Sequence, residues 1–384
     1  MTSLIRDLAA STPEMIDVFG DAATVRAALR FEAALAGACA AEGLVSPEAA
    51  RAVICACSKP PDLESLAREA AHAGVLAIPL VRWLRTTADT VSPGAGDAVH
   101  LGATSQDLAD TAMVLQAREA ARLVDGDLAR LADSLADLAE THAATPMIGR
   151  TLLQQALPVT FGLKAAHWMM SIEGVRARLR READSAMMLQ FGGPAGTLGG
   201  LAGKGDAVAR RMATELGLGC PLLPWHSRRE AIAGLASALA IVVGAIAKIA
   251  LDVALLAQVE VGEVSIPRQG DRGGSSAMPH KRNPTGSQIA LSAAHRAPGL
   301  ATSILAGMPQ AHERGLGGWQ AETPVLVELF LITHGAVVAV AGQVDGLDVH
   351  TDAMRRTLDA AGLGQDIGES LDMVRRALAN REIR

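Results

Sequence analysis

The middle of the chain carries an apolar pattern with the period of an α-helix. Val124, Leu128, Leu131, Leu135 and Leu138 follow one another at spacings of four, three, four and three. This spacing places the five side chains on one face and predicts a long packed helix. Further helices are predicted over residues 227 to about 263, which we expect to be the longest, over 283–306, and from about 323 through 341. No stretch alternates as a strand does, so the pattern predicts an all-α long-helix bundle.

The two ends of the chain have shorter patterns. Residues 1–98 predict short helices separated by turns, including an apolar segment, 70–85, that is kinked at Pro79. The last forty residues predict one or two short helices. We therefore expect three parts: an N-terminal helical domain (1–98), a central long-helix bundle (99–342) and a short C-terminal helical segment (343–384).

Composition supports a helical bundle and limits the possible partners. Of the 384 residues 49% are hydrophobic but only 2% are aromatic, and there is no Tyr. The hydrophobic residues are mainly Ala, Leu, Val, Ile and Met, and this composition favours close-packed helices over sheets. With 35 basic and 41 acidic residues the net charge is −6, which gives no indication of a nucleic-acid surface.

The sequence predicts a soluble protein that resides in a reducing compartment. The four cysteines are Cys39, Cys55, Cys57 and Cys220. Their spacing fits neither a zinc site nor a disulfide framework, so we expect reduced thiols and a cytoplasmic location. The first residues lack the apolar core of a signal peptide. Residues 231–247 are apolar enough to suggest a membrane span, but Lys248 and Asp252 continue the same helix, which favours a bundle helix.

Three polar loops interrupt the helices. The first, 100–111, reads HLGATSQDLADT, and Thr104 and Ser105 are suited to cap a helix whose free amides can bind an anion. Capping alone would also explain them. The second, 146–158, has donors from Gly149 to Gln155 and is expected to precede a helix from about Pro158. The Gly-rich residues 190–205 lack the strand that a nucleotide loop requires and are interpreted as a helix-breaking turn.

The third loop is the most distinctive stretch of the chain. Residues 273–284 read GGSSAMPHKRNP, with glycines that free the backbone and Pro279 and Pro284 that interrupt any helix. Its polar side chains are Ser275, Ser276, His280, Lys281, Arg282 and Asn283. By charge alone this would be an ordinary basic surface loop. The combination of hydroxyls, cations and amides fits proton abstraction next to a carboxylate, because the resulting dianion needs fixed donors and a cation.

The string GGSSAMPHKRNP resembles the signature loop of the fumarase/aspartase superfamily, GSSxMPxKxNP, and the resemblance covers nearly the whole chain. It implies Ser275 as general base, with Lys281 and Asn283 holding substrate carboxylates and the dianion. It implies carboxylate binding by His100, Thr104 and Ser105, and we add Thr151, Gln154, Ser276 and Trp319 as substrate contacts. It also implies an all-α homotetramer with a twenty-helix core, three subunits at each active site and a small tricarboxylate substrate. No cofactor, metal, nucleic acid or membrane partner is expected.

One departure from the superfamily pattern narrows the expected chemistry. Members that expel an amine or hydroxide usually read GRTH in the second loop, where the histidine helps to protonate the leaving group; this chain reads GRTL, with Leu152. A carboxylate leaves as an anion and needs no acid. We therefore expect the branch that adds an internal carboxylate across a double bond to form a lactone, whose strings ERGLGGWQAE (313–322) and HLGATSQDLADT also match.

Other functions remain open at this point. A lyase of the same superfamily acting on adenylosuccinate or another succinyl compound is the first alternative, and Leu152 argues against it. A crystallin-like structural member that keeps the fold without catalysis is the second, and the intact Ser275, Lys281 and Asn283 argue against it. A membrane or helical scaffold protein would leave the signature loop unexplained.

Overall fold

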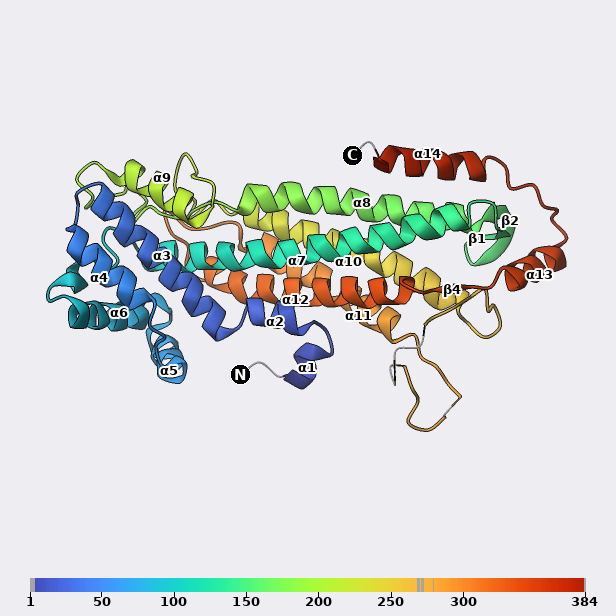
Figure 1. The fold of residues 1–384 in the computed structure, drawn as a ribbon, viewed down its shortest axis with the longest axis horizontal. Helices are drawn as coiled ribbons and strands as arrows, with labels where there is room; N and C mark the ends of the chain where they lie inside the picture. Colours follow the sequence, from blue (N-terminus) through green and yellow to red (C-terminus); the bar gives the residue numbers. More distant parts are fainter. Residues whose placement is uncertain (1–3, 268–269, 271–272, 279, 383–384) are drawn as a thin grey trace.

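Long helices run side by side and give the protein an elongated shape (Figure 1). The computed structural model describes residues 4–267, 270, 273–278 and 280–382. Pro279, one of the two prolines expected to interrupt any helix through the third loop, lies outside the described residues. The mostly helical bundle confirms the predicted fold class in its coarse form. The division into three domains and the twenty-helix core stay predictions.

The helices of residues 21–98 lie at one end of the molecule, the first two helices lie along the bundle, and the long helices form the body (Figure 1). The helices are α1 (Leu4–Leu8), α2 (Pro13–Val18), α3 (Asp21–Ala41), α4 (Pro47–Cys57), α5 (Leu63–Ala73), α6 (Ala77–Val91), the 3₁₀ helix η1 (Ala95–Ala98), α7 (Ser105–Thr141), α8 (Phe161–Ala186), α9 (Gly205–Leu216), α10 (Glu230–Leu256), α11 (Thr285–Gly307), α12 (Gly318–Val344), α13 (Thr351–Ala361) and α14 (Ser370–Glu382).

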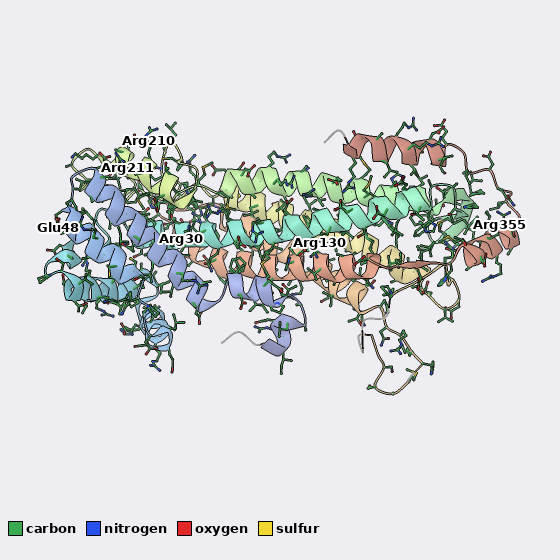
Figure 2. The ribbon with its side chains drawn as sticks, viewed as in Figure 1. Arg30, Glu48, Arg130, Arg210, Arg211 and Arg355 are labelled. Atoms are coloured by element: carbon green, nitrogen blue, oxygen red, sulfur yellow. The ribbon has the colours of Figure 1, made fainter. Side chains whose placement is uncertain are left out.

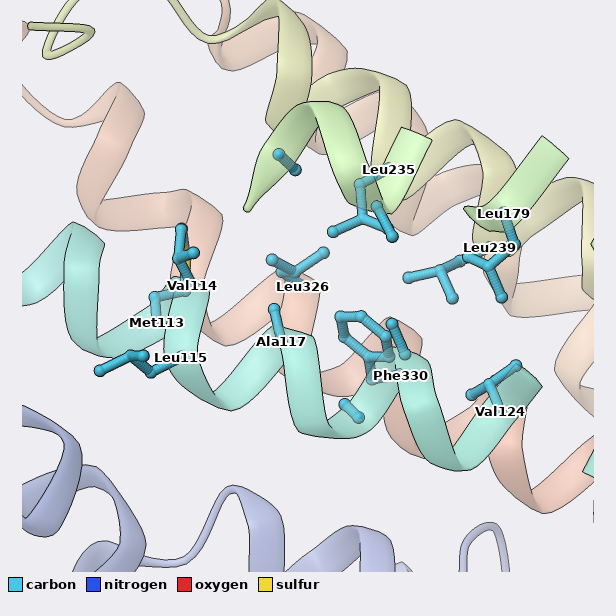
Figure 3. Close-up of a cluster of buried hydrophobic side chains, with 14 of the residues drawn as sticks. Met113, Val114, Leu115, Ala117, Val124, Leu179, Leu235, Leu239, Leu326 and Phe330 are labelled. Atoms are coloured by element: carbon cyan, nitrogen blue, oxygen red, sulfur yellow. The ribbon is translucent and has the colours of Figure 1, made fainter. Parts of the chain in front are cut away.

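The bundle core forms where α7 packs on α8 and α12 and where α10 packs on α8, α11 and α12. The predicted seam of α7 is confirmed, since Val124, Leu128, Leu131 and Leu135 are fully buried and Leu138 is half-buried against the same core. Figure 3 shows how Val124 of α7 faces the same core as Leu239 of α10 and Phe330 of α12. Small Ala residues between these larger ones let the helices approach closely, as the composition indicated.

The second polar loop is a β-hairpin, which corrects the expectation of a loop and of a chain without strands. β1 (Pro146–Thr151) pairs antiparallel with β2 (Gln154–Thr160), and the helix that follows starts at Phe161 rather than near Pro158. The turn residues Leu152 and Leu153 have positive φ of 51° and 63°. Tight hairpin turns of this kind normally use Asn or Gly, so the sequence carried no hairpin signal. A second short pair, β3 (Val264–Ser265) and β4 (Asp348–Val349), lies near the same end.

Two further expectations about helices are wrong. The longest helix is α7 with 37 residues, not the segment 227–263, because α10 spans only 27 residues from Glu230 to Leu256. Pro79 does not kink a helix, because it lies in the first turn of α6, where its missing N–H is not needed. The break lies instead at Gly74, which ends α5 with a φ of 76°.

Within the described part of the chain, two helices, α10 and α12, are long and apolar enough to cross a membrane by length and composition. Half or more of each apolar window is buried inside the bundle, which fits the predicted bundle helix at residues 231–247. Charged side chains extend from the outside of the bundle, as the exposed Arg30, Arg210 and Arg211 do over α3 and α9 (Figure 2).

Candidate active site

The signature loop, residues 273–284, connects the β3 region to α11 and closes on itself. The Asn283 amide donates to the Gly273 carbonyl over 2.8 Å, and the Asn283 side chain donates to the Gly274 carbonyl over 3.4 Å. Gly273 has a φ of 78°, and a Cβ there would lie 2.5 Å from the Asn283 carbonyl oxygen. Only glycine fits such an approach, so the two ends of the loop are held together.

Within the loop, Ser275 is placed differently from its neighbour. Its hydroxyl oxygen accepts hydrogen bonds from the amides of Ala277 (3.3 Å) and Met278 (3.0 Å), and the residue is half-buried. Amide hydrogens aimed at an oxygen stabilise its anionic form. Ser276 is exposed, and in the described part of the loop no amide donates to its hydroxyl. This geometry suits Ser275 to hold or release a proton.

The cations of the loop face solvent. Lys281 is exposed, as are His280 and Arg282, while the Lys281 amide donates to the Met278 carbonyl over 3.0 Å. Among the described residues no carboxylate pairs with the Lys281 ammonium. The backbone of this lysine is therefore fixed while its charge remains available to an anion.

The β1–β2 hairpin lies at the same end of the bundle as the signature loop (Figure 1). Thr151 and Gln154 face each other across its turn, and both are exposed. Leu152 at the tip is 96% exposed. Leu152 is therefore an exposed apolar side chain at a turn whose positive φ disfavours leucine.

The first polar loop lies at the opposite end. His100, Thr104 and Ser105 come just before or at the start of α7, and the hairpin follows its end (Figure 1). A helix of 37 residues is about 55 Å long at ~1.5 Å per residue. One chain therefore brings the second and third loops to one end and leaves the first loop at the other.

Contacts around the first loop fix its shape. The His100 ring nitrogen Nδ1 lies 2.5 Å from the buried Glu32 carboxylate, and the His100 amide donates to the same group over 3.0 Å. Thr104 caps α7 in a reciprocal capping box with Asp107, and Ser105 is the first helical residue. The predicted N-cap is thus confirmed as a structural feature.

A buried polar network that the sequence reasoning missed supports this end. Asp107 accepts from the amides of Gly192 and Gly193 at 3.0 and 2.9 Å and lies 2.7 Å from His226 Nε2. Arg229, with no exposed side-chain surface, donates to both carboxylate oxygens of Asp110 at 2.9 Å and to Glu322 at 2.6–3.0 Å.

The charges of this network keep Arg229 ionised. Burial lowers the pKa of Arg229, but Asp110 and Glu322 outweigh it and leave that pKa above its ordinary value. The network joins the starts of α7 and α12, so Trp319 lies at the end of the bundle that carries the first loop. The sequence signal that could have found it is the run of charged residues, Arg228 to Glu230, at the start of the most apolar helix.

Trp319 is buried at the start of α12, being 8% exposed, and its indole N–H has no partner among the described residues. A buried indole donor normally finds an acceptor. Because a carboxylate oxygen is such an acceptor, this orphan donor is consistent with the predicted contact to substrate.

Comparisons with known proteins agree with this geometry. The model of a family described as lyase matches residues 7–299. The chain is 47% identical over 341 residues to a 3-carboxy-cis,cis-muconate cycloisomerase of Bradyrhizobium diazoefficiens, covering 88% of this chain and 76% of the relative. The chain belongs to this lyase family. The 3-carboxy-cis,cis-muconate lactonizing enzyme of Pseudomonas putida matches with a TM-score of 0.89 and 40% identity over 100% of this chain and 89% of the solved chain.

Another lyase relative is named for a different reaction. The chain is 40% identical over 383 residues to a nitrosuccinate lyase of Streptomyces davaonensis, which covers 97% of this chain and 80% of that protein. Both comparisons extend beyond the signature loop through almost all of the chain, so the resemblance expected from that loop is confirmed at the level of the family.

Proposed function

We propose that the chain is a 3-carboxy-cis,cis-muconate cycloisomerase, which interconverts that tricarboxylate and 4-carboxymuconolactone in the breakdown of protocatechuate. The similarity to lactonizing enzymes along most of the chain carries the proposal. Incubating the purified protein with 3-carboxy-cis,cis-muconate and following the products by proton NMR tests it. A new lactone resonance with loss of vinyl signals is expected, and an unchanged spectrum would refute it.

The proposed mechanism uses the signature loop. In the lactone-opening direction Ser275 takes the proton next to a carboxylate, the resulting dianion is held by Lys281 and Asn283, and the lactone oxygen leaves as a carboxylate. Lactone formation follows the same steps in reverse. The amides of Ala277 and Met278 on the Ser275 oxygen support this role, because they stabilise the alkoxide that acts as base. No cofactor enters the scheme.

Substrate binding is assigned to residues from all three loops. The loop residues are His100, Thr104, Ser105, Thr151, Gln154 and Ser276, and Trp319 of α12 is added to them. Since these groups lie at opposite ends of one chain, a complete site requires loops from neighbouring chains. A partner that lies antiparallel brings its first loop beside the signature loop and hairpin of this chain.

We propose a homotetramer with a twenty-helix core on these grounds. The apolar residues left exposed on the long helices, such as Ile241 and Leu251 of α10, support an assembly that covers them. Light scattering at micromolar concentration should report the mass of four chains. A monomer would refute the assembly and leave the three loops unable to form one site.

The position of Leu152 leads to a prediction on the leaving group. Leu152→His should not accelerate lactonisation and should slow it by up to about tenfold, because in the proposed assembly Leu152 is covered and a polar side chain would enter an apolar wall. Steady-state kinetics measure this, with Leu152→Met as a matched control expected to stay near the wild-type rate. Faster lactonisation by Leu152→His would show that the reaction lacks an acid it needs.

A second candidate is elimination of nitrite from nitrosuccinate. The nitrosuccinate lyase relative covers 97% of this chain, more than the first cycloisomerase relative does. Nitrite, like a carboxylate, leaves as a stable anion, so Leu152 does not separate these two reactions. It does disfavour amine elimination from adenylosuccinate, where the departing nitrogen needs a proton.

We also propose a soluble, cytoplasmic enzyme without nucleic-acid or membrane partners. The net charge of −6 and the burial of α10 and α12 within the bundle support this proposal. Fractionation of cells that express the full chain tests the location, and recovery with the membranes would contradict it.

A further inference from the structure

We propose that Arg150 and Glu263 form a clamp that positions the signature loop against the hairpin, and that both are positioning residues for the reaction. This inference rests on the proposed function. It assigns a role to two residues that the sequence analysis left without one. The clamp joins the hairpin to the segment that precedes the signature loop, and these two are far apart in the sequence but lie at one end of the bundle (Figure 1).

The hairpin is built to direct Arg150. The register of β1 and β2 shifts between Ile148 and Arg150, where Gly149 faces an extra residue of β2. A Cβ on Gly149 would lie 2.7 Å from the Leu157 carbonyl oxygen, so no other residue fits there. The extra residue lies on β2, and bulges of this kind bend the strand pair locally. Arg150 follows this irregularity on β1, two residues before the turn residue Leu152.

The carboxylate that Arg150 meets is completely buried. Arg150 Nη1 and Nη2 donate to the two oxygens of Glu263, each over 2.8 Å, and the Glu263 side chain has no exposed surface. Two parallel bonds fix both distance and orientation, which one contact cannot do. Among the described residues, Arg150 is the one cation that pairs with Glu263.

Glu263 is also fixed through its backbone. Its amide donates to the Leu256 carbonyl and its carbonyl accepts from the His350 amide, both over 3.0 Å. β3 begins at the next residue and leads toward the signature loop. The segment that leads to that loop is therefore tied, at Glu263, to α10, to the segment before α13 and, through Arg150, to the hairpin.

A third charge next to the clamp is not its partner. Burial lowers the pKa of Lys164, and Lys248 and Arg150 lower it further against Asp252 and Glu263. Lys164 therefore interacts electrostatically with both members of the clamp. Lys164 belongs to the first turn of α8, directly after β2. If Arg150 were lost, the positive charge near Glu263 would therefore come from α8 and not from the hairpin.

Removing the clamp should lower kcat more than it raises KM, since the reacting groups are misplaced while the loop cations remain. For Arg150→Met we expect kcat to fall about 10- to 100-fold with KM changed less than about threefold. Arg150→Lys, which keeps the charge but loses the paired geometry, should lie between this variant and wild type. Exchanging the charges, with Arg150→Glu and Glu263→Arg together, should recover at least about tenfold over either single variant.

The matched control is the Arg180–Asp125 pair, which also has two short contacts, at 2.8 and 2.9 Å, but joins α8 to α7 away from the loops. Arg180→Met should leave kcat within about twofold of wild type. Equal losses for Arg180→Met and Arg150→Met, or no recovery in the exchanged pair, would overturn the clamp.

A readout independent of turnover separates this inference from the proposed reaction. Hydrogen exchange at the amides of Ala277, Met278 and Asn283 should be faster in Arg150→Met than in wild type, and unchanged in Arg180→Met. Unchanged exchange in folded Arg150→Met and Arg150→Lys would refute the clamp even if the enzyme is active. Faster exchange in a protein without lactonising activity would support the clamp and refute the reaction.

Discussion

Ser275→Ala is expected to lower kcat by about 10²-fold or more while the substrate still binds. The Ser275 oxygen is held by two loop amides, and no other hydroxyl in the described part of the loop has this pair of donors. Alanine removes the proton acceptor without changing the glycine-closed backbone. Steady-state kinetics with 3-carboxy-cis,cis-muconate give kcat and KM separately.

Ser276→Ala serves as the comparison, because Ser276 is the adjacent hydroxyl and is assigned to substrate binding alone. It should raise KM by less than about tenfold and leave kcat nearly unchanged. A near-normal kcat for Ser275→Ala, with a large loss in Ser276→Ala, would transfer the role of base to Ser276.

Lys281→Met is expected to lower kcat/KM by about 10²- to 10⁴-fold, because in the proposed assembly neighbouring chains cover the loop and a cation in a water-poor site stabilises the dianion by several kcal/mol. Methionine keeps much of the length of the side chain and removes its charge. The exposed ammonium has no carboxylate partner among the described residues, so the loss of an internal ion pair would not explain the effect.

Arg282→Met is the matched control for Lys281→Met. Arg282 is the next residue, is also exposed and cationic, and has no proposed role. Its variant should change kcat/KM by less than about threefold. Wild-type kinetics in Lys281→Met would make the lysine a surface charge, and equal losses in both variants would mean that only the net charge of the loop matters.

The helical body was predictable from the sequence because its signal is periodic. Leu128, Leu131 and Leu135 repeat at helical spacing and are buried as that spacing requires. The hairpin was not predictable in this way. Leu152 and Leu153 adopt a turn conformation that their side chains disfavour, and the strands on either side do not alternate apolar with polar residues.

The candidate site was predictable only as separate loops. The string around Ser275 identified a loop suited to proton transfer, and Thr104 was recognised as an N-cap candidate from its residue type. The contacts between distant residues could not be predicted, because Arg229 meets Asp110 and Glu322, and Arg150 meets Glu263, only through the packing of helices and strands. Their positions along the chain have no fixed spacing that would reveal the pairs.

The most direct test of the proposed reaction is a parallel ultraviolet assay of kcat/KM for 3-carboxy-cis,cis-muconate, nitrosuccinate, adenylosuccinate and argininosuccinate with the native protein. The account predicts that the muconate is converted to its lactone with a kcat/KM at least about 10³-fold above those of the two amine-releasing substrates and above that of nitrosuccinate. Efficient cleavage of adenylosuccinate would contradict the role given to Leu152. Preference for nitrosuccinate would replace the cycloisomerase with a nitrite-eliminating lyase.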